Sequence, residues 1–378
     1  MKITFFVSGN VRSNFSYRVV ALATALHKLG NETTIIAPKA DKYNDFIPEN
    51  IADINGVKIL QPFQFTTRRL EINLFPYLFG AFNALRKEKS DLIYIYKPTP
   101  ISIVGLLGKF FWRIPVIVDI DDLGSEVMKI EGHPYHQRKL VAWSERLAVG
   151  YADRLVAAST YLFDMYHREF PKKPIHIMSN GVDPEWFEKT IASQAAKKII
   201  FLGALNRKSI LEPLLDVMPK IIEHIPEAQA LIIGDGKYLA YFKQKSEYLK
   251  IDKNITFTGW LKLSDARAHL HEGDIGYGYM PNETTVIAAN NMKISQYMSR
   301  GVVPLVSDVG DLPAMVDFGR VGYIAKANDL EALESVLLDA LNDKDRPKKA
   351  AKAPLFSLEK YSWDTLANSL NQWIYGRA

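Results

Sequence analysis

Short apolar runs alternate with longer amphipathic stretches along most of this chain. The first run, Lys2–Ser8, has apolar residues at consecutive positions, which is typical of a strand buried on both faces of a sheet. Phe15–Leu29 then places apolar residues at helical spacing until Gly30 ends the pattern. Further strand-like runs follow, most of them separated by helical patterns: Glu32–Pro38, Asp91–Tyr96, Pro115–Asp119, Arg154–Ser159 and Ile175–Ser179. This order predicts a parallel sheet covered by helices on both faces.

The same pattern restarts after a polar stretch at Glu188–Lys198. New strands are predicted in KKIIFLG, ALIIGDG, NITFTG, IGYGYM, Val303–Ser307 and Gly322–Ala325. We therefore predict an α/β protein made of two tandem Rossmann-like, doubly wound domains, at residues 1–180 and 181–355, with a cleft between them. Residues 356–378 are expected to return to the first domain through an amphipathic helix over Leu358–Tyr375, after a solvated basic loop at Lys344–Lys352.

Composition narrows the possible chemistry and location. The 378 residues fit two domains, and 48% hydrophobic with 24% charged residues is usual for a soluble globular protein. The absence of cysteine excludes disulfides, thiolate catalysis and cysteine–zinc sites. No secretory signal or membrane span is evident, so we expect a cytoplasmic protein. Leu74–Lys89 and Ile101–Arg113 mix aromatic and basic residues, a pattern shared by core helices and by helices at a membrane surface, which leaves a peripheral position on the inner face of the cell membrane open.

Doubly wound domains bind ligands beyond the carboxyl ends of their strands, so the loops at those ends are the first candidates for a site. The loop Ser8–Arg18 joins the first predicted strand to the first helix and lacks the GxGxxG pattern of a dinucleotide site. Gly9, Asn10, Arg12 and Ser13 are its candidate residues for lining an active-site cleft. The alternative is plain turn and helix-cap chemistry.

Three aspartates follow the strand predicted at Pro115–Asp119, in the sequence DIDDLGSE. Carboxylates in such a place are costly unless they face a cleft or bind something. Asp119 and Asp122 are therefore the candidate catalytic residues, with Asp122 placed to take a proton from an attacking sugar hydroxyl. Metal binding is the alternative for these aspartates, although no second carboxylate cluster that would complete such a site is evident.

The second domain offers two candidate phosphate sites. GALNRKS places Gly203 where the backbone can approach a ligand, and Arg207 and Lys208 beside it as a phosphate clamp. The stretch 276–311 predicts a strand, a polar loop, a short helix and a second strand, and its helix carries Lys293 and Gln296 on one face. A helix start suits a phosphate, so we expect this stretch to hold the diphosphate and ribose of a nucleotide, with Asn290 and Asn291 at the helix cap. Surface roles are the alternative for all these side chains.

Taken together, these segments resemble the two-Rossmann-domain glycosyltransferases called GT-B, and in particular the bacterial sugar transferases of family 4. The resemblance covers nearly the whole chain and is carried by the order and spacing of ERLAVGYADRLVAAS, NGVDPEWF, FLGALNRK, LIIGDG, ITFTGW, MKISQYMSRGVVPLVSD and YSW. It implies a nucleoside diphosphate sugar donor bound mainly by the second domain, with Arg207, Lys208 and Lys293 near the diphosphate. It also implies an acceptor bound by the first domain, no required metal or other cofactor, and a last helix that returns to the first domain.

One signature departs from the family. Family 4 normally has two glutamates seven residues apart, and this chain has Ala288 and Gln296 in their places. The run Met292-Lys293-x-x-Gln296-Tyr297 is similar instead to the bacterial glucuronosyltransferase of xanthan assembly, an inverting GT-B enzyme. Its base is an aspartate in a segment like DDLGS, which again implies Asp122. Retention and inversion both stay open.

We therefore expect a glycosyltransferase of polysaccharide or glycolipid biosynthesis that uses a nucleotide-sugar donor and a glycan or lipid-linked acceptor. The donor-site candidates are Gly203, Arg207, Lys208, Asn291, Met292, Lys293 and Gln296. Two alternatives remain: an epimerase or hydrolase of nucleotide sugars with the same fold, and a non-catalytic nucleotide-sugar-binding homologue. A nucleic-acid partner is not expected, because the basic residues are dispersed and no recognition module is evident.

Overall fold

The computed structural model describes residues 1–11, 16–39, 52–62, 70–188 and 197–376. The chain forms two compact units. The first comprises Met1–Asn180, Ala288–Asn290 and Trp363–Ala378, and the second comprises Gly181–Ile287 and Asn291–Ser362. Arg12 and Ser13, two of the candidate acceptor residues, lie outside the described residues.

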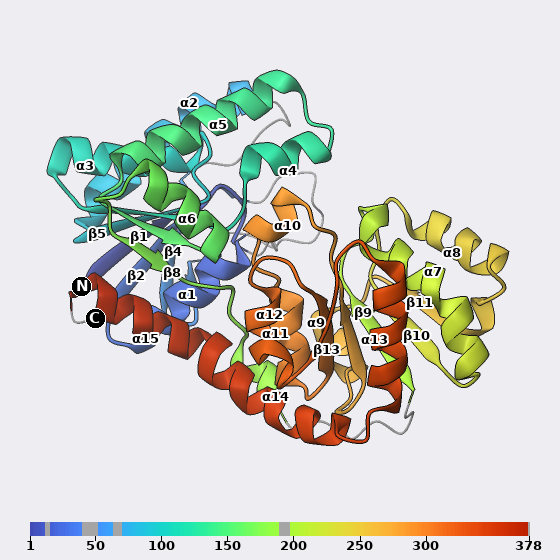
Figure 1. Cartoon of the computed structure of the whole chain (residues 1–378). Coiled ribbons are helices and arrows are strands. Elements are labelled where there is room, and N and C mark those ends of the chain that lie inside the picture. The colour runs from blue at the N-terminus through green and yellow to red at the C-terminus, as the bar shows by residue number, and fades with distance from the viewer. Residues whose placement is uncertain (12–15, 40–51, 63–69, 189–196, 377–378) are drawn as a thin grey trace. The chain divides into compact units, whose positions relative to one another are not determined.

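The first unit is built on a sheet with the strand order β3-β4-β2-β1-β5-β6-β7-β8 among the described residues (Figure 1). Its strands are β1 (Lys2–Phe6), β2 (Glu32–Ile36), β3 (Asp53–Ile54), β4 (Val57–Leu60), β5 (Leu92–Tyr96), β6 (Val116–Ile120), β7 (Arg154–Ala157) and β8 (Ile175–Ile177). All pairs are parallel except β3 with β4. The predicted parallel sheet is confirmed, and the short hairpin β3–β4 was missed. The Asn55–Gly56 turn, with positive φ at both residues, is the signal that could have revealed the hairpin.

Helices cover both faces of this sheet and bury two apolar clusters against it. α1 (Tyr17–Lys28) and α15 (Trp363–Ile374) contribute to one cluster. Residues of α2 (Leu70–Glu88), α5 (Tyr135–Tyr151) and α6 (Thr160–Glu169) contribute to the other. The remaining helices of this unit are η1 (Ser102–Gly105), α3 (Leu106–Trp112) and α4 (Gly124–Ile130). Because both faces are covered, β5 and β6 are buried at every position, which explains the continuous apolar sequence of β5.

The second unit repeats the architecture with a parallel sheet in the order β11-β10-β9-β12-β13-β14. Its strands are β9 (Lys198–Leu202), β10 (Gln229–Ile233), β11 (Ile255–Gly259), β12 (Ile275–Gly278), β13 (Val303–Ser307) and β14 (Tyr323–Ala325). Its α-helices are α7 (Lys208–His224), α8 (Leu239–Tyr248), α9 (Leu263–Ala268), α10 (Thr284–Ala288), α11 (Met292–Ser299), α12 (Leu312–Met315), α13 (Leu330–Asn342) and α14 (Arg346–Tyr361), and its short 3₁₀ turns are η2 (Pro184–Phe187), η3 (Asp252–Asn254) and η4 (Asp317–Gly319). The sheet order changes direction at β9, where β10 lies on one side and β12 on the other.

The end of the chain differs from the prediction in two ways. The basic stretch expected as a loop forms the first turns of α14, because Pro347 suits a first helical turn and Ala350 and Ala353 pack inward. The helix expected from Leu358 onward is interrupted at Ser362, whose backbone is extended. The segment that belongs to the first unit therefore begins at Trp363, later than the residue 356 that the pattern suggested.

Candidate active site

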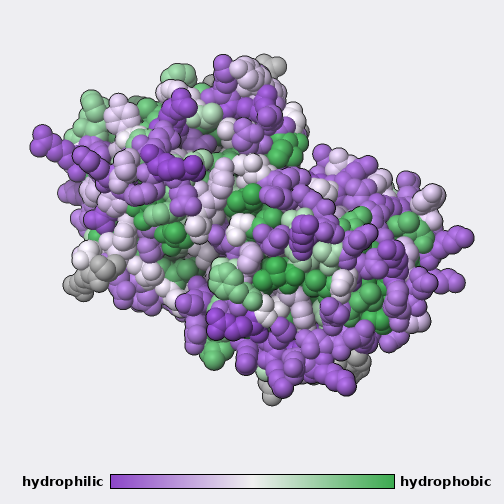
Figure 2. Space-filling model, in the orientation of Figure 1, coloured by the Kyte–Doolittle hydropathy of each residue, from purple (hydrophilic) through white to green (hydrophobic). Residues whose placement is uncertain are grey.

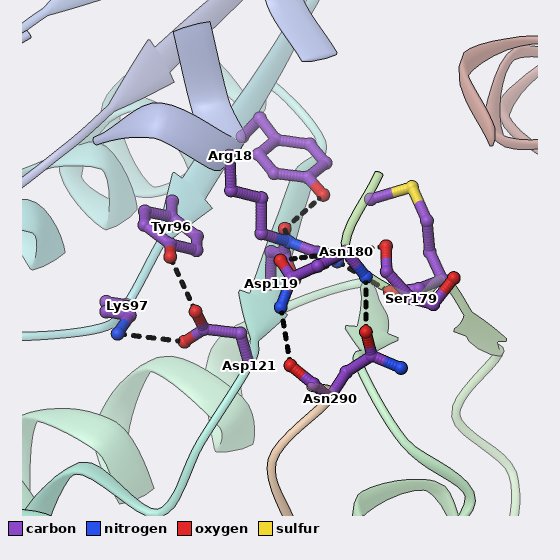
Figure 3. Close-up of polar contacts among 10 residues, drawn as sticks. Arg18, Tyr96, Lys97, Asp119, Asp121, Ser179, Asn180 and Asn290 are labelled. Atoms are coloured by element: carbon purple, nitrogen blue, oxygen red, sulfur yellow. Dashed lines mark hydrogen bonds and ion pairs between the residues drawn. The ribbon is translucent and has the colours of Figure 1, made fainter. Parts of the chain in front are cut away.

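The carboxyl edge of the first sheet carries a compact ionic cluster. β5 and β6 run in parallel with Tyr96 opposite Asp119, so the residues after both strands emerge side by side. The Lys97 ammonium lies 3.2 Å from Asp121 Oδ1, and the Tyr96 hydroxyl donates to Asp121 Oδ2 at 2.6 Å (Figure 3). The same ammonium lies 2.8 Å from Asp122 Oδ2. We call Lys97, Asp121 and Asp122 the Lys97 cluster. Lys97 and Asp122 of this cluster lie 25 residues apart in the sequence.

Asp119 belongs to a different and fully buried network. Arg18, from the first turn of α1, donates from Nε to Asp119 Oδ2 at 2.9 Å and from Nη2 to Oδ1 at 3.1 Å. Tyr94 adds a third hydrogen bond at 2.8 Å. The other guanidinium hydrogens reach the carbonyls of Met178 and Ser179 and the side chain of Asn180.

These contacts saturate the Asp119 carboxylate and the Arg18 guanidinium, and both side chains are at most 2% exposed. A buried, hydrogen-bonded ion pair of this kind ties β6, α1 and the end of the first unit together. Burial raises the pKa of Asp119, and the Arg18 charge opposes that rise. The catalytic role expected for Asp119 therefore has no access to a substrate in this arrangement, and its contacts assign it to support of the fold.

Asp122 is the accessible carboxylate at this edge. Its side chain is 24% exposed, compared with 11% for Asp121. Burial and the neighbouring charge of Asp121 raise the pKa of Asp122, while Lys97 acts in the opposite direction. A carboxylate with a raised pKa is a stronger base, so the arrangement keeps Asp122 suited to accept a proton.

A cavity of about 380 Å³ opens beside this carboxylate, entirely within the first unit. The Lys97 cluster lines one side, and Met128 and Val141, from α4 and α5, line another. The cavity thus combines charged and apolar walls, which suits a ligand with hydroxyl groups and an apolar part.

Glu145 of α5 also lines this cavity, and the sequence analysis missed it. Burial raises the pKa of Glu145 to about 7, although the hydrogen bond from the Tyr166 hydroxyl at 3.0 Å lowers it. The available signal was helical periodicity, since Glu145 follows the buried Ser144 and precedes the buried Ala148 and Val149 on α5. An acid beside the inward face of a helix, with its pKa raised by burial, is a candidate for a functional group.

The loop after β1 contributes backbone structure where it is described. Ser16 Oγ donates to the Gly9 carbonyl at 3.2 Å, which links the segment after β1 to the residue before α1. Gly9 and Asn10 are partly buried. Ser16 occupies the N-cap position of α1 without capping it by its side chain.

The segment Ala288–Asn290 belongs to the first unit, although Asn290 was expected to cap α11. The Asn180 backbone N–H donates to Asn290 Oδ1 at 3.0 Å, and Asn180 Nδ2 donates to the Asn290 carbonyl at 3.1 Å (Figure 3). Ser159 Oγ donates to the carbonyl of Ala288, whose side chain is fully buried. Asn290 therefore does not cap α11, which corrects the prediction. Asn291 holds the N-cap position, with no hydrogen bond from its side chain to the helix.

In the second unit, Lys293 approaches the carboxyl end of β9. Its ammonium lies 4.4 Å from the centre of the Phe201 ring, and a Cβ atom placed on Gly203 would lie 3.1 Å from Nζ. Lys293 makes no hydrogen bond or ion pair with the residues that the structure describes. Burial lowers the pKa of Lys293 to about 8. An ammonium held without a counterion beside an open glycine backbone is suited to bind an anion.

The two cations of the GALNRKS loop point to different surroundings. Arg207 lies 3.7 Å from Glu283 and donates to Thr285 Oγ1 at 3.3 Å, beside the segment that leads into α11. The Lys208 ammonium instead sits 3.6 Å from the ring centre of Tyr241, on α8. The structure thus separates two residues that the sequence left equivalent, and Arg207 is the better placed for a ligand near α11.

Gln296 lies one turn after Lys293 on α11 and is 5% exposed. Its side-chain amide makes no hydrogen bond with the described part of the chain. Met292 is the first residue of this helix.

Gly234 and Gly236, after β10, leave no room for a Cβ beside the backbone of the Gly203–Asn206 loop, so the glycines allow the two loops to pack closely.

Two known sequence families match consecutive parts of the chain. Residues 16–186 match Glycosyltransferase Family 4, and residues 196–343 match Glycosyl transferases group 1. The sulfoquinovosyl transferase SQD2 of Arabidopsis thaliana is 23% identical over 214 residues, which is 54% of this chain and 40% of that protein. A GDP-mannose-dependent alpha-(1-6)-phosphatidylinositol monomannoside mannosyltransferase of Mycobacterium tuberculosis is 21% identical over 240 residues, covering 59% of this chain and 62% of that protein. The chain thus spans less than two thirds of the length of these relatives.

Solved structures show the same fold along the whole chain. The structure of HepE from Anabaena, in complex with UDP and glucose, covers 100% of this chain and 100% of its own, with a TM-score of 0.73 and 13% identity. This likeness confirms the predicted pair of Rossmann-like domains.

Proposed function

We propose that this chain, which belongs to the glycosyltransferases by both of its domain matches, transfers a hexosyl group from a nucleoside diphosphate sugar to a glycan or lipid-linked acceptor. The observation that carries the proposal is the Lys293 ammonium, which lies partly buried beside Gly203 and has no counterion among the described residues. A diphosphate would supply that missing charge. The complexes of HepE with UDP and with UDP-glucose support a donor of this class.

The donor residues follow from this placement. Lys293 and the backbone at Gly203 and at the start of α11, Asn291 and Met292, would hold the diphosphate, and Arg207 would add a second positive charge. Gln296, one turn further on, would hydrogen-bond the ribose hydroxyls. Lys208 is a weaker candidate because it stacks on Tyr241. The similarity of the Met292–Tyr297 run to the xanthan glucuronosyltransferase supports the same use of lysine and glutamine.

The acceptor would bind in the cavity of the first unit, beside Asp122, and Gly9 and Asn10 stay proposed acceptor residues. Its hydroxyl would give its proton to Asp122 while the hydroxyl oxygen forms the new bond to the anomeric carbon. The bond from that carbon to the diphosphate breaks, and the diphosphate leaves with the bonding electron pair, stabilised by Lys293 and Arg207. A base aligned with the acceptor favours inversion at the anomeric carbon.

The proposal extends to cofactors and location. Lys293 and Arg207 would neutralise the leaving diphosphate, so we propose a reaction without a metal cofactor. A lipid-linked acceptor would place the protein in the cytoplasm at the inner face of the cell membrane. No helix among the described residues is long and apolar enough to cross a bilayer.

The proposal is tested by screening nucleoside diphosphate sugars for a thermal shift of the protein, followed by assay of the stabilising donor. Sugar transfer to an added acceptor, with an unchanged rate in EDTA, is the expected result. Proton NMR of the product's anomeric position then reports inversion or retention. Turnover of the donor in the absence of any acceptor would indicate a hydrolase or epimerase instead. Binding with no release of diphosphate would indicate a non-catalytic homologue.

A further inference from the structure

Two neighbouring helices of the first unit expose large aromatic side chains. On α2, Phe75 and Phe79 are 78% and 72% exposed and lie four residues apart, which places them on one face. On α3, Phe110 and Phe111 are 79% and 57% exposed. Figure 2 shows hydrophobic side chains at the molecular surface where α3 lies in Figure 1. We call Phe75, Phe79, Leu107, Phe110, Phe111 and Trp112 the aromatic face.

The aromatic face is held together by contacts between the two helices. Phe82 of α2 stacks on Trp112 with ring centres 5.3 Å apart and meets the edge of Phe111 at 5.6 Å. The opposite side of α2 carries Tyr77 and Leu85, which are buried against the sheet. α2 is therefore apolar on both sides, although covering the sheet requires only one apolar side. A surplus apolar face of this kind marks a surface that meets another apolar phase.

Exposed cations border the aromatic face. Arg86, in the last turn of α2, lies four residues after Phe82 and so on the same side of the helix, and Arg113 follows α3. Neither arginine makes an ion pair with the described residues. Two acids of this region already have partners, because Glu88 pairs with Lys58 and Asp153 pairs with Lys109. The rim of the aromatic face thus carries positive charge without local compensation.

We propose that the aromatic face and its basic rim dock the protein on an anionic phospholipid surface. Aromatic rings insert at the level of the lipid headgroups, and arginine and lysine pair with anionic headgroups, so one surface satisfies both requirements. The unpaired cations favour an anionic lipid over a second copy of this chain, since two such faces would repel each other. The inference rests on the proposed function only in that a lipid-linked acceptor would be found at this surface.

Co-sedimentation of the full chain with vesicles tests the proposal. Vesicles of phosphatidylcholine alone are compared with vesicles containing about 30% phosphatidylglycerol, and binding is expected to the second kind. The double substitution Phe79→Ser and Phe110→Ser is expected to lower the partition coefficient at least about 10-fold. Arg86→Gln with Arg113→Gln is expected to lower it about 30-fold on the anionic vesicles only.

Tyr248→Ser is the matched control, because Tyr248 is 84% exposed on α8 in the second unit. It should leave vesicle binding unchanged. Equal binding by the double phenylalanine variant and the unaltered chain would overturn the proposal. So would a dimer in light scattering that the same variant abolishes, because the aromatic face would then join copies of the protein.

Donor binding, followed by thermal shift in the same variants, separates this inference from the proposed function. It should be unchanged in the phenylalanine and arginine variants, because their residues lie outside the donor site. Vesicle binding without any stabilising donor would remove the proposed function and leave the docking surface. A stabilising donor without vesicle binding would do the reverse.

Discussion

The carboxyl edges of the two sheets differ in whether their charged side chains have counterions. At the edge of the first sheet, Lys97 lies between two aspartates, and behind it Arg18 and Asp119 neutralise each other. At the edge of the second sheet, Lys293 stands beside Phe201 with no counterion among the described residues. A compensated pair supports the fold, whereas an uncompensated buried charge indicates a ligand that completes it. The two edges therefore suggest a base for the acceptor and an anion site for the donor.

The largest expected effect tests the first edge. Asp122→Asn should reduce turnover about 10²-fold to 10⁴-fold without changing donor affinity, because an amide does not accept the acceptor's proton. Steady-state kinetics with the donor identified by thermal shift measures both quantities. Near-normal turnover would remove Asp122 as the base.

Asp121→Asn is the matched control within the Lys97 cluster. The charge of Asp121 raises the pKa of Asp122, so its removal should lower that pKa. Turnover should therefore persist, and the acidic limb of the pH–rate profile should move to lower pH. An unmoved limb would mean that another group titrates in the reaction.

The buried ion pair of Arg18 and Asp119 should contribute to the stability of the fold and not to the transfer reaction. Arg18→Met leaves Asp119 buried and without its counterion, which is expected to lower the free energy of unfolding by about 3–5 kcal/mol. Urea denaturation measures the change. Lys109→Met, at a half-exposed ion pair with Asp153, is the control and should cost less than about 1 kcal/mol. A similar loss of unfolding free energy in both variants would show that the buried ion pair contributes no more to stability than the half-exposed one.

Glu145 tests how far burial governs the acceptor cavity. Its pKa in the folded chain is about 7, above the usual 4.5, so the folded state keeps a proton that the unfolded state loses. The stability associated with this proton is fully present below pH 4.5 and is lost as the pH rises to about 7.

Glu145→Gln removes that titration and keeps an oxygen that can accept the hydrogen bond from Tyr166. The variant should match the original chain near pH 4.5 and exceed its free energy of unfolding by up to about 3 kcal/mol above pH 7. Denaturation curves across this range give the difference. A difference that does not change with pH would show that the pKa of Glu145 is the same in the folded and unfolded states.

The smallest expected effect concerns Lys293, at the carboxyl edge of the second sheet. Lys293→Met should weaken binding of the nucleoside diphosphate about 10-fold to 100-fold, because a charge-assisted contact is lost. It should also raise the free energy of unfolding, since the buried ammonium, with its pKa lowered to about 8, is unfavourable at neutral pH. Calorimetric titration with UDP and a denaturation curve report the two effects.

Two further measurements sharpen this test. In the unaltered chain, UDP binding should weaken as the pH rises above about 8, where Lys293 loses its proton. Lys208→Met provides the control, because Lys208 lies on Tyr241, and it should change UDP affinity much less than Lys293→Met does. Equal losses in both variants would place the diphosphate between the two lysines.

Much of this protein was determined by the sequence itself. Runs such as LIYIY, separated by amphipathic stretches, predict parallel strands, because a strand covered on both faces is apolar at nearly every position. The change from sheet to helix period identifies most elements, and two such series identify two domains. Segments with weak patterns were missed or misjudged: the two-residue strand β3, and the basic start of α14, which owes its helix to Pro347 and the packing of Ala350.

Other properties were decided only by the tertiary structure. Arg18 and Asp119 are 101 residues apart in the sequence. Their pairing depends on where the fold places α1 relative to β6. Asp119 and Asp122 look alike in the sequence, yet one is buried in a saturated network and the other borders a cavity. Arg207 and Lys208 are adjacent, yet their side chains reach different helices. Burial and contact with distant residues set the charge and access of each group, and neither follows from local spacing.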